Sequence, residues 1–235
     1  MTSKQINKIK RKFERKFATI GVIGLGYVGL PLTLTFVSNA FQVYGFDIDQ
    51  TKIDTLTNGE SYIQYISNEN IARSVSTNMF TPTSDFSKIS EVDAILICVP
   101  TPLTSNLEPD LTFITSTAEL IKPYLKKDQL IVLESTTYPG TSTEVLKPIL
   151  EGSDLISGED FFLAYSPERE DPGNKTFRTA SIPKIVGGDG NNALQIACTM
   201  YNQVVVETIP VSSLDIADAF KLSENIFRSV NIAMV

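Results

Sequence analysis

The chain of 235 residues is long enough for one large domain, and its 42% hydrophobic residues are enough to fill a sizeable core. The net charge of −7 argues against nucleic acid as a general partner, and the absence of histidine excludes histidine-based catalysis and the usual zinc sites within these residues. No run of 18 apolar residues or secretory signal pattern occurs, so we expect a soluble, cytoplasmic protein that has no membrane partner.

The first 17 residues predict a basic extension. Seven Lys and Arg residues lie between Lys4 and Lys16, and four apolar residues, Ile6, Ile9, Phe13 and Phe17, are interspersed among them. A basic segment can contact an anionic surface. The interspersed apolar residues favour a simpler interpretation, a solvated helix that packs lightly on the body of the protein.

A glycine-rich turn follows, between a predicted strand over 19–24 and a predicted helix over 27–40. Its sequence is GLGYVG. Gly24 allows the tight turn, Gly26 lets the backbone approach a pyrophosphate, and Gly29 permits close packing of the helix on the strand. The amides at the start of the helix are available to phosphate. The pattern predicts a dinucleotide site.

An acidic residue lies where such a site needs one. The second predicted strand, over 41–49, contains GFDID, and Asp47 can accept hydrogen bonds from ribose hydroxyls and repel a 2′-phosphate, which favours NAD over NADP. Asp49 is an alternative ribose partner, but its position favours capping the helix predicted over 50–60. Lys52 of that helix can reach the adenosine end of the cofactor or remain solvated.

Strand and helix patterns alternate along the rest of the chain, and residues 61–89 predict a loop with a helix around 68–74. Hydroxyls, prolines and carboxylates follow three apolar strands, in CVPTP, ESTTYPG and YSPEREDPG. Because ligands bind outside the carboxyl ends of parallel strands, these loops are candidate binding segments. The remaining predicted elements are strands over 93–100, 129–136, 161–168, 181–190 and 203–209, and helices over 111–125, 140–152 and 191–201.

Near-continuous apolar strands separated by helices predict an α/β fold, a Rossmann-like, doubly wound, mostly parallel sheet followed by the start of a long helix. That helix, over 212–235, is apolar nearly all round and ends without a stop signal, so we expect it to pack against something. Lys221 and Asn225 share one of its faces, where an ammonium and an amide suit a developing alkoxide. Lys221 could instead pair with Glu224 or Asp218.

Several motifs together resemble the UDP-glucose/GDP-mannose dehydrogenase family, the nucleotide-sugar 6-dehydrogenases. They are IGVIGLGYVGLPL, GFDID, ICVPTPL, PDL, ESTTYPG, SPERE, KIVGG and AFKLSENIFRSVNIAMV, and they extend from about Ala18 to Val235. SPEREDPGN, VPTPL and LESTTYPGT are most similar to the branch that acts on UDP-N-acetylhexosamines for surface polysaccharides. The resemblance implies a UDP-sugar substrate whose C6 alcohol is oxidised to a carboxylate with two NAD+.

The resemblance also implies roles for individual residues. Thr136 and Glu168 would handle water and protons, and Lys221 and Asn225 would stabilise an oxyanion. Glu168 could instead form an ion pair with Arg169. The implied cofactor-binding residues are Gly24, Gly26, Tyr27, Val28, Gly29, Asp47, Lys52, Val99, Pro100, Thr101, Ser135 and Thr136.

The sequence departs from the family pattern in two places. The family's nucleophilic cysteine lies in a Gly-Gly-His-Cys motif beyond the long helix, and these residues contain no such motif. Cys98 and Cys198 lie in apolar runs and are interpreted as packing residues, so neither is assigned that role. After SPE the chain continues REDPG, where Glu170 is an open candidate for a second carboxylate. We expect this chain to bind NAD but not to complete the oxidation alone.

The expected organisation is a basic extension over 1–17, an NAD-binding Rossmann-like domain over 18–210 and the beginning of the central (dimerisation) helix over 211–235. The nucleotide-sugar-binding domain is absent from these residues, and the resemblance implies a homodimer through the central helix. Two alternatives stay open. One is a 3-hydroxyacid-type dehydrogenase with a single hydride transfer, against which ESTTYPG and SPERE argue. The other is a catalytically inactive NAD-binding module that pairs with a full-length relative.

Overall fold

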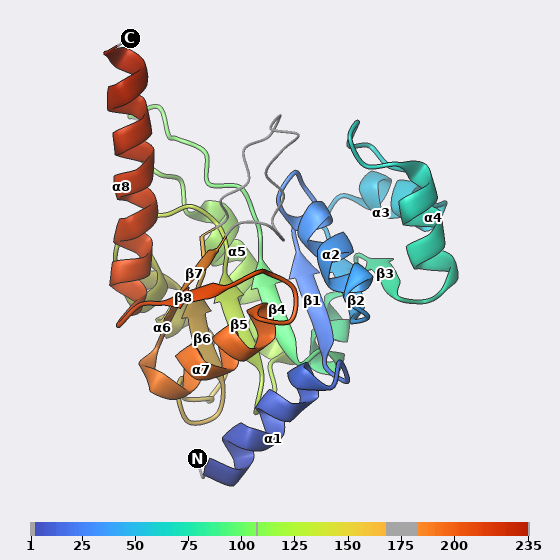
Figure 1. The fold of residues 1–235 in the computed structure, drawn as a ribbon, viewed down its shortest axis with the longest axis horizontal. Coiled ribbons are helices and arrows are strands. Elements are labelled where there is room, and N and C mark those ends of the chain that lie inside the picture. The colour runs from blue at the N-terminus through green and yellow to red at the C-terminus, as the bar shows by residue number, and fades with distance from the viewer. Residues whose placement is uncertain (1–2, 107, 168–182, 235) are drawn as a thin grey trace.

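The structure is a computed structural model that describes residues 3–106, 108–167 and 183–234. Within these ranges one eight-stranded sheet runs through the molecule in the order β3-β2-β1-β4-β5-β6-β7-β8 (Figure 1). Neighbouring strands are parallel except β6 and β7, which are antiparallel. The predicted doubly wound, mostly parallel sheet is confirmed. The strands are β1 (Thr19–Ile23), β2 (Gln42–Phe46), β3 (Phe80–Thr83), β4 (Ala94–Ile97), β5 (Leu130–Leu133), β6 (Phe162–Tyr165), β7 (Lys184–Gly188) and β8 (Thr208–Pro210).

Helices cover both faces of the sheet because side chains alternate along each central strand. In β5, Leu130 and Val132 pack on one face with α1, α2 and α7, and Ile131 and Leu133 pack on the other with α5, α6 and the start of α8. The α-helices are α1 (Ser3–Glu14), α2 (Gly29–Ser38), α3 (Gln50–Thr57), α4 (Asn68–Ser76), α5 (Thr112–Ile121), α6 (Lys147–Glu151), α7 (Gly190–Tyr201) and α8 (Leu214–Ala233). Shorter helical turns are η1 (Phe86–Glu91), η2 (Lys122–Tyr124) and η3 (Thr141–Leu146).

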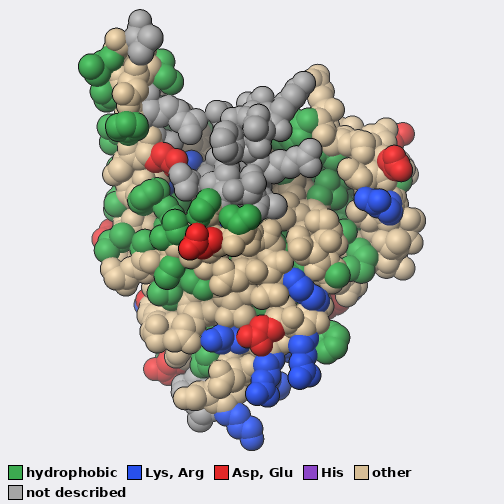
Figure 2. Space-filling view, viewed as in Figure 1, with side chains coloured by type: hydrophobic (Ala, Val, Ile, Leu, Met, Phe, Trp, Pro, Cys, Tyr) green, Lys and Arg blue, Asp and Glu red, His purple; other side chains and the backbone are tan. Residues whose placement is uncertain are grey.

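The basic extension is the helix α1, and it packs more firmly than the sequence predicts. Ile6, Ile9 and Phe13 are buried, and the helix lies against α7. Phe17 does not join them, since it is 75% exposed just after the helix ends. Basic side chains gather at this end of the molecule (Figure 2).

The two edge strands are the elements that sequence patterns describe least well. Residues 80–83 form β3 inside the predicted 61–89 loop, and η1 follows it. Conversely, the strand predicted over 203–209 is wrong over 203–207, because the chain turns there and β8 begins only at Thr208. Each edge strand contains a proline, Pro82 in β3 and Pro210 in β8.

The long helix α8 begins on the body of the protein and extends beyond it (Figure 1). Ser213 caps it by accepting a hydrogen bond from the Ile216 N–H, and Leu214 and Ala217 are buried. Farther along, large apolar side chains are exposed, namely Ile216, Phe220, Leu222, Ile226, Phe227, Val230, Ile232 and Met234. Within the described ranges, α8 and the other helices are all too short or too polar to span a bilayer.

Candidate functional site

The glycine turn joins β1 to α2 in a geometry that only glycine fits. Gly24 has a φ of +90°, and a Cβ there would lie 2.8 Å from the Cys98 carbonyl oxygen. A Cβ on Gly29 would lie 1.9 Å from the carbonyl oxygen of Gly24, so this glycine lets α2 start directly against the turn. Gly26 differs, because nothing lies within 4 Å of its Cβ position. The space beside Gly26 belongs to a pocket, and no side chain caps the start of α2.

Asp47 follows β2 at the same edge and is already hydrogen-bonded. Its Oδ2 accepts from the Leu25 N–H at 2.9 Å and from Lys52 Nζ at 3.1 Å, and its Oδ1 accepts from the Asp49 N–H at 3.0 Å. Asp49 caps α3 through the Thr51 N–H, as predicted. Lys52 is therefore paired with Asp47 rather than merely solvated.

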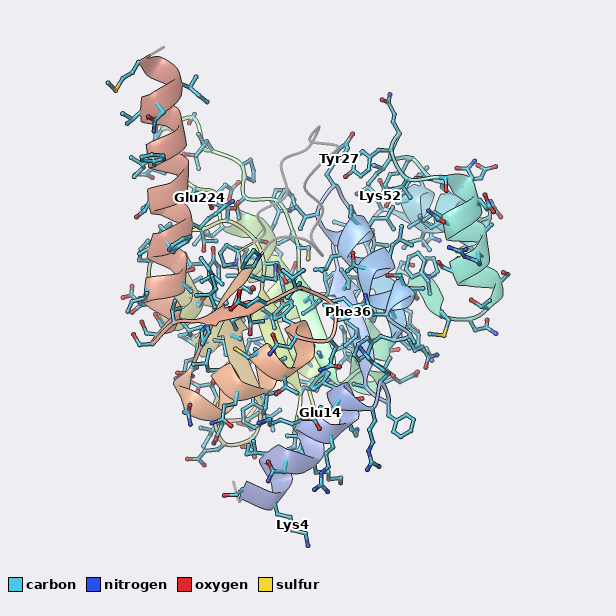
Figure 3. All side chains as sticks on the ribbon, in the orientation of Figure 1. Lys4, Glu14, Tyr27, Phe36, Lys52 and Glu224 are labelled. Carbon is cyan, nitrogen blue, oxygen red and sulfur yellow. The ribbon has the colours of Figure 1, made fainter. Side chains whose placement is uncertain are left out.

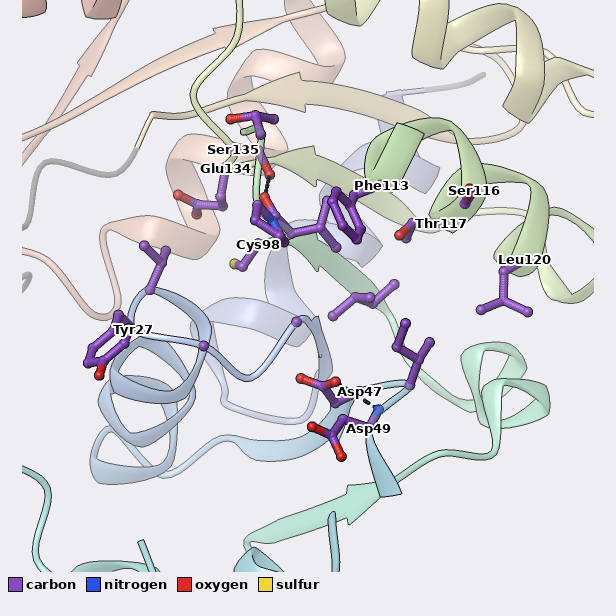
Figure 4. Close-up of a pocket in the computed structure, with 18 of the residues that line it drawn as sticks. Tyr27, Asp47, Asp49, Cys98, Phe113, Ser116, Thr117, Leu120, Glu134 and Ser135 are labelled. Atoms are coloured by element: carbon purple, nitrogen blue, oxygen red, sulfur yellow. Dashed lines mark hydrogen bonds between the residues drawn. The ribbon is translucent and has the colours of Figure 1, made fainter. Parts of the chain in front are cut away.

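A pocket of about 700 Å³ runs along the carboxyl ends of the strands. Asp47 and Asp49 lie on one side of it, and Glu134 and Ser135 lie on the other (Figure 4). Every predicted cofactor-binding residue lines the pocket except Gly29, which supports the turn from behind. The uncapped helix start, the open space at Gly26 and the ribose-side carboxylate match the needs of a dinucleotide, so these residues fit NAD.

The loops after β4 and β5 are tied together at the far side of the pocket. Ser135 Oγ donates to the carbonyl oxygen of Val99 at 2.6 Å, and Thr101 Oγ1 donates to the carbonyl oxygen of Thr136 at 2.7 Å. Ser135 is buried, whereas Thr136 is exposed to the pocket. The two loops therefore form one wall, with the Thr136 hydroxyl available to a ligand.

The predicted catalytic residues are placed only in part. Thr136 and Lys221 line the same pocket, although they lie 85 positions apart in the sequence. Asn225 lies one turn beyond Lys221 on α8, and its side chain is outside the description. Glu168 and Glu170 also lie outside the described residues, so the structure leaves their roles as predictions.

A buried ionic cluster that the sequence patterns did not predict lies beneath the pocket. Glu134 lines the pocket and is 1% exposed. Its Oε2 accepts from Lys184 Nζ at 2.7 Å, and its Oε1 accepts from the hydroxyl of Tyr201. A buried carboxylate must be paired, so a glutamate at the end of an apolar strand was a signal for a cationic partner. The sequence did not show which residue would pair with Glu134, because Lys184 lies on the distant strand β7.

Helix α5 supplies a further side of the pocket that sequence analysis also missed. Phe113, Ser116, Thr117 and Leu120 line it, and the two apolar members are each about 40% exposed. The sequence held no signal for this wall, because only the structure separates the exposed Phe113 and Leu120 from the core residues of the same helix. Cys98 also lines the pocket, but it is 8% exposed and belongs to the main core, and Cys198 packs at the edge of that core. Both cysteines pack as predicted.

A buried polar cluster lies where α8 begins. Asp218 is fully buried, and its Oδ1 accepts a hydrogen bond from Thr137 Oγ1 at 3.3 Å. Burial raises the pKa of Asp218 to about 7. Repulsion from the Asp215 carboxylate raises the pKa further. The hydrogen bonds from Thr137 and from the Gly140 N–H act in the opposite direction and lower it. Burial also raises the pKa of Tyr165, at the end of β6, and the nearby carboxylate of Asp218 adds to that rise.

Comparison with known families matches most of the chain to one model. Residues 18–205 match the NAD binding domain of the UDP-glucose/GDP-mannose dehydrogenase family. The match begins directly before β1 and covers the strands from β1 to β7 and helix α7, ending before β8. It contains the glycine turn, Asp47 and the loops after β4 and β5.

Individual relatives agree with the family model. The chain is 38% identical to Protein CapL of Staphylococcus aureus and 36% identical to UDP-N-acetyl-D-glucosamine 6-dehydrogenase of Pseudomonas aeruginosa, each over 92% of this chain. A crystal structure of NDP-N-acetyl-D-galactosaminuronic acid dehydrogenase from Methanosarcina mazei superposes with a TM-score of 0.86 at 35% identity, over 98% of this chain and 51% of that one. The chain spans about half the length of the curated relatives it matches.

Proposed function

The chain belongs to the UDP-glucose/GDP-mannose dehydrogenase family, and from this we propose that it is the NAD-binding portion of a UDP-sugar 6-dehydrogenase. The reaction would oxidise the C6 alcohol of a UDP-N-acetylhexosamine to the uronic acid with two NAD+. The names of the relatives from Pseudomonas and Methanosarcina support an N-acetylhexosamine over UDP-glucose. The proposed organisation remains an extension over 1–17, an NAD-binding domain over 18–210 and the central helix over 211–235.

The observation that carries this proposal is the continuity of the pocket. One cavity contains the glycine turn, Asp47, Thr136 and Lys221, which come from four separate parts of the chain. In the proposed pose the adenosine ribose lies against Asp47, and the pyrophosphate lies over Gly26 at the start of α2. The nicotinamide then lies on the wall formed by the loops after β4 and β5, beside Thr136 and Lys221.

Two described side chains would act directly on the sugar. Bound NAD+ would supply the hydride acceptor. Lys221 would place its ammonium beside the C6 oxygen and stabilise the negative charge that develops there. Thr136, whose backbone is held by Thr101, would orient a water or substrate hydroxyl. Glu168 and Asn225 remain proposed partners in proton transfer and oxyanion stabilisation, respectively. The nucleophilic cysteine of the family motif is not among these residues, so we expect no complete oxidation by this chain.

We also propose that two copies associate through α8. Its exposed apolar side chains extend along the helix from Ile216 to Met234. A helix with such a surface is stabilised by a partner that covers it. A second copy presents the same surface, which suits a twofold interface.

Isothermal titration tests the cofactor proposal. We expect NAD+ to bind this chain more tightly than NADP+, and Asp47→Ala to weaken NAD+ binding by about tenfold, because it removes the acceptor for the ribose hydroxyls. Asp54→Ala is the matched control, since Asp54 is an exposed acidic residue of α3 that does not line the pocket. Equal binding of NAD+ by the wild type and Asp47→Ala would contradict the proposed pose.

A further inference from the structure

Three segments that carry proposed catalytic residues meet at one buried carboxyl group. Asp218 lies one turn before Lys221 on α8, and it accepts a hydrogen bond from Thr137, which directly follows Thr136. Tyr165 ends β6 and lies close enough to Asp218 for that carboxylate to raise the pKa of the Tyr165 hydroxyl. Asp218 is fully buried, and the hydrogen bond that it accepts from Thr137 joins α8 to the loop after β5.

The cluster has more polar atoms than hydrogen bonds. Asp218 Oδ2 and Tyr165 Oη are each buried and make no hydrogen bond of ordinary geometry within the described residues. A buried carboxylate oxygen that receives no donor is unfavourable, whereas a protonated carboxyl is tolerated. When the proton leaves, the Asp218 carboxylate gains from drawing the Tyr165 hydroxyl toward it. Two arrangements of the same side chains are therefore available.

A shift at Thr137 reaches the pocket through short connections. The residues on its N-terminal side, Ser135 and Thr136, are hydrogen-bonded to Val99 and Thr101. All four of these residues line the pocket. The wall proposed to hold the nicotinamide is thus connected to Asp218 through the hydrogen bond of Thr137. The wall proposed to hold the adenosine instead follows directly from β1 and β2.

The charged and titratable groups around Asp218 come from all the elements packed against this part of α8. These elements are β6, β7 and η3, and the loop after β5 lies beside them. The groups that these segments carry are Asp215, Lys221 and Glu224 on α8, Tyr165 on β6, Lys184 on β7, Glu144 on η3, Glu134 at the end of β5 and Tyr138 in the loop after it. Lys184 is engaged with Glu134, and repulsion from Asp215 disfavours the Asp218 carboxylate.

We propose that Asp218 is a positioning residue that couples α8 to the 135–137 segment, so that loss of its proton changes the nicotinamide half of the pocket. The proposal rests on the proposed function, because it takes this pocket to be the NAD site. Its effect is on position, since Asp218 does not line the pocket and so would not touch the cofactor.

Amide NMR of the ligand-free chain gives a test that does not depend on cofactor binding. In a pH titration we expect the amides of Thr136, Thr137, Gly140 and Lys221 to move with one shared midpoint near neutrality. Asp218→Asn should remove that midpoint, and Asp54→Asn should leave it in place. Shifts confined to Asp218 itself, or a shared midpoint that persists in Asp218→Asn, would overturn the proposal.

Binding of NAD+ and of adenosine then separates positioning from a general structural role. Adenosine occupies only the adenosine half and has no group that titrates between about pH 6 and about pH 8, unlike a phosphate monoester, so its affinity should stay constant over that interval. The NAD+ affinity should change by about fivefold or more over that interval in the wild type and stay constant in Asp218→Asn. Equal changes for both ligands would indicate a structural role and overturn the proposal.

Two further outcomes are distinguishable. If neither ligand binds the wild type, the proposed function fails, and the NMR titration alone decides the coupling. If Asp218→Asn does not fold, Thr137→Val replaces it, because this variant keeps the carboxyl group and removes its tie to the loop. Thr137→Val should abolish the shared midpoint at the Thr136 amide while the Lys221 amide signal still moves with that midpoint, and a midpoint unchanged at both positions would contradict the coupling.

Discussion

Asp47 holds three hydrogen bonds in the structure, and one of them comes from a side chain that can move. An ionised carboxylate offers about four acceptor positions, so three donors leave little room for two ribose hydroxyls. The backbone donors Leu25 and Asp49 are fixed by the turn and by the start of α3. Lys52 is 35% exposed, and an ion pair at that exposure is weak. We therefore expect the ribose to displace Lys52.

Replacement of this lysine should sharpen cofactor choice. In Lys52→Met the carboxylate keeps its backbone donors, and its charge is no longer screened against a 2′-phosphate. We expect NAD+ affinity to stay within about threefold and NADP+ affinity to fall by about tenfold, measured by titration calorimetry. Lys88→Met, an exposed lysine outside the pocket, should change neither value. A loss of NAD+ affinity without loss of NADP+ would show that Lys52 holds the cofactor itself.

Asp218 should make the protein less stable as the pH rises. Its folded-state pKa, about 7, is raised above the ordinary value of 3.8, so the folded state holds the proton more tightly than the unfolded state. Its contribution is fully present below about pH 4 and is lost as the pH rises toward 7. Asp218→Asn removes this dependence. We therefore expect the free energy of unfolding of the variant to exceed that of the wild type by on the order of 2 kcal/mol at about pH 8 and to differ little from it near pH 4.

Thermal unfolding followed by circular dichroism across this pH range measures that difference. Asp54→Asn serves as the control, because an exposed carboxylate should give the same small change at each pH. A stability difference between Asp218→Asn and the wild type that does not vary with pH would contradict the raised pKa.

At the scale of elements, two glycines of the same turn have different expected roles, Gly29 in packing and Gly26 in cofactor binding. Gly29 meets the carbonyl oxygen of Gly24 and Gly26 meets open space, so the same substitution should act differently at the two positions. We expect Gly29→Ala to lower the free energy of unfolding by about 2 kcal/mol or more. Gly26→Ala should leave stability within about 0.5 kcal/mol and weaken NAD+ binding about tenfold, because its methyl group occupies the pyrophosphate position.

Urea unfolding and calorimetric titration of the two variants test this contrast. Retention of full NAD+ affinity by Gly26→Ala would place the pyrophosphate elsewhere. A fully stable Gly29→Ala would show that α2 can move away from the turn.

Sequence patterns predicted the central strands well because each is a continuous apolar run between helices. They failed at the two edge strands, because a strand that pairs on one side only tolerates residues that a central strand excludes. The proline in β3 argued against a strand, but an edge strand tolerates it. The β-branched run at Val204 and Val205 favoured a strand, but these side chains are buried in a turn against the core. In the site, motif spacing identified residues that line one pocket, whereas the partners of Glu134 and Asp218 required the tertiary structure.

At the scale of the whole molecule, the two ends of the protein differ in chemistry. Tyr27 and Lys52 lie near the loops that form the pocket, and Lys4 and Glu14 lie on α1 at the opposite end (Figure 3). The exposed apolar surface of α8 lies apart from the basic helix, at the pocket end (Figure 2). Association through α8 would therefore leave α1 and its charges exposed.

The proposed dimer can be tested with two equally exposed phenylalanines. Phe227 on α8 is 73% exposed, and Phe17 after α1 is 75% exposed. We expect sedimentation to give a dimer for the wild type and for Phe17→Ser, and Phe227→Ser to weaken association by about tenfold or more. A monomeric wild type, or equal association of both variants, would contradict an interface on α8.

The edge prolines bear on a different kind of association, the addition of strands from other molecules. At β3 the N–H of Asp47 donates to the carbonyl oxygen of Thr83, so Thr83 faces β2 and the preceding Pro82 faces outward. The outward position is where a strand offers its N–H groups to an incoming strand, and proline has none.

The opposite edge repeats this arrangement. The N–H of Val211 donates to the carbonyl oxygen of Val186, so the preceding Pro210 faces away from β7. An eight-stranded sheet flanked by two such prolines lacks a complete ladder of outward donors at either described edge. The protein is thereby protected against edge-to-edge aggregation and fibril growth while its helical surface stays free to bind a partner.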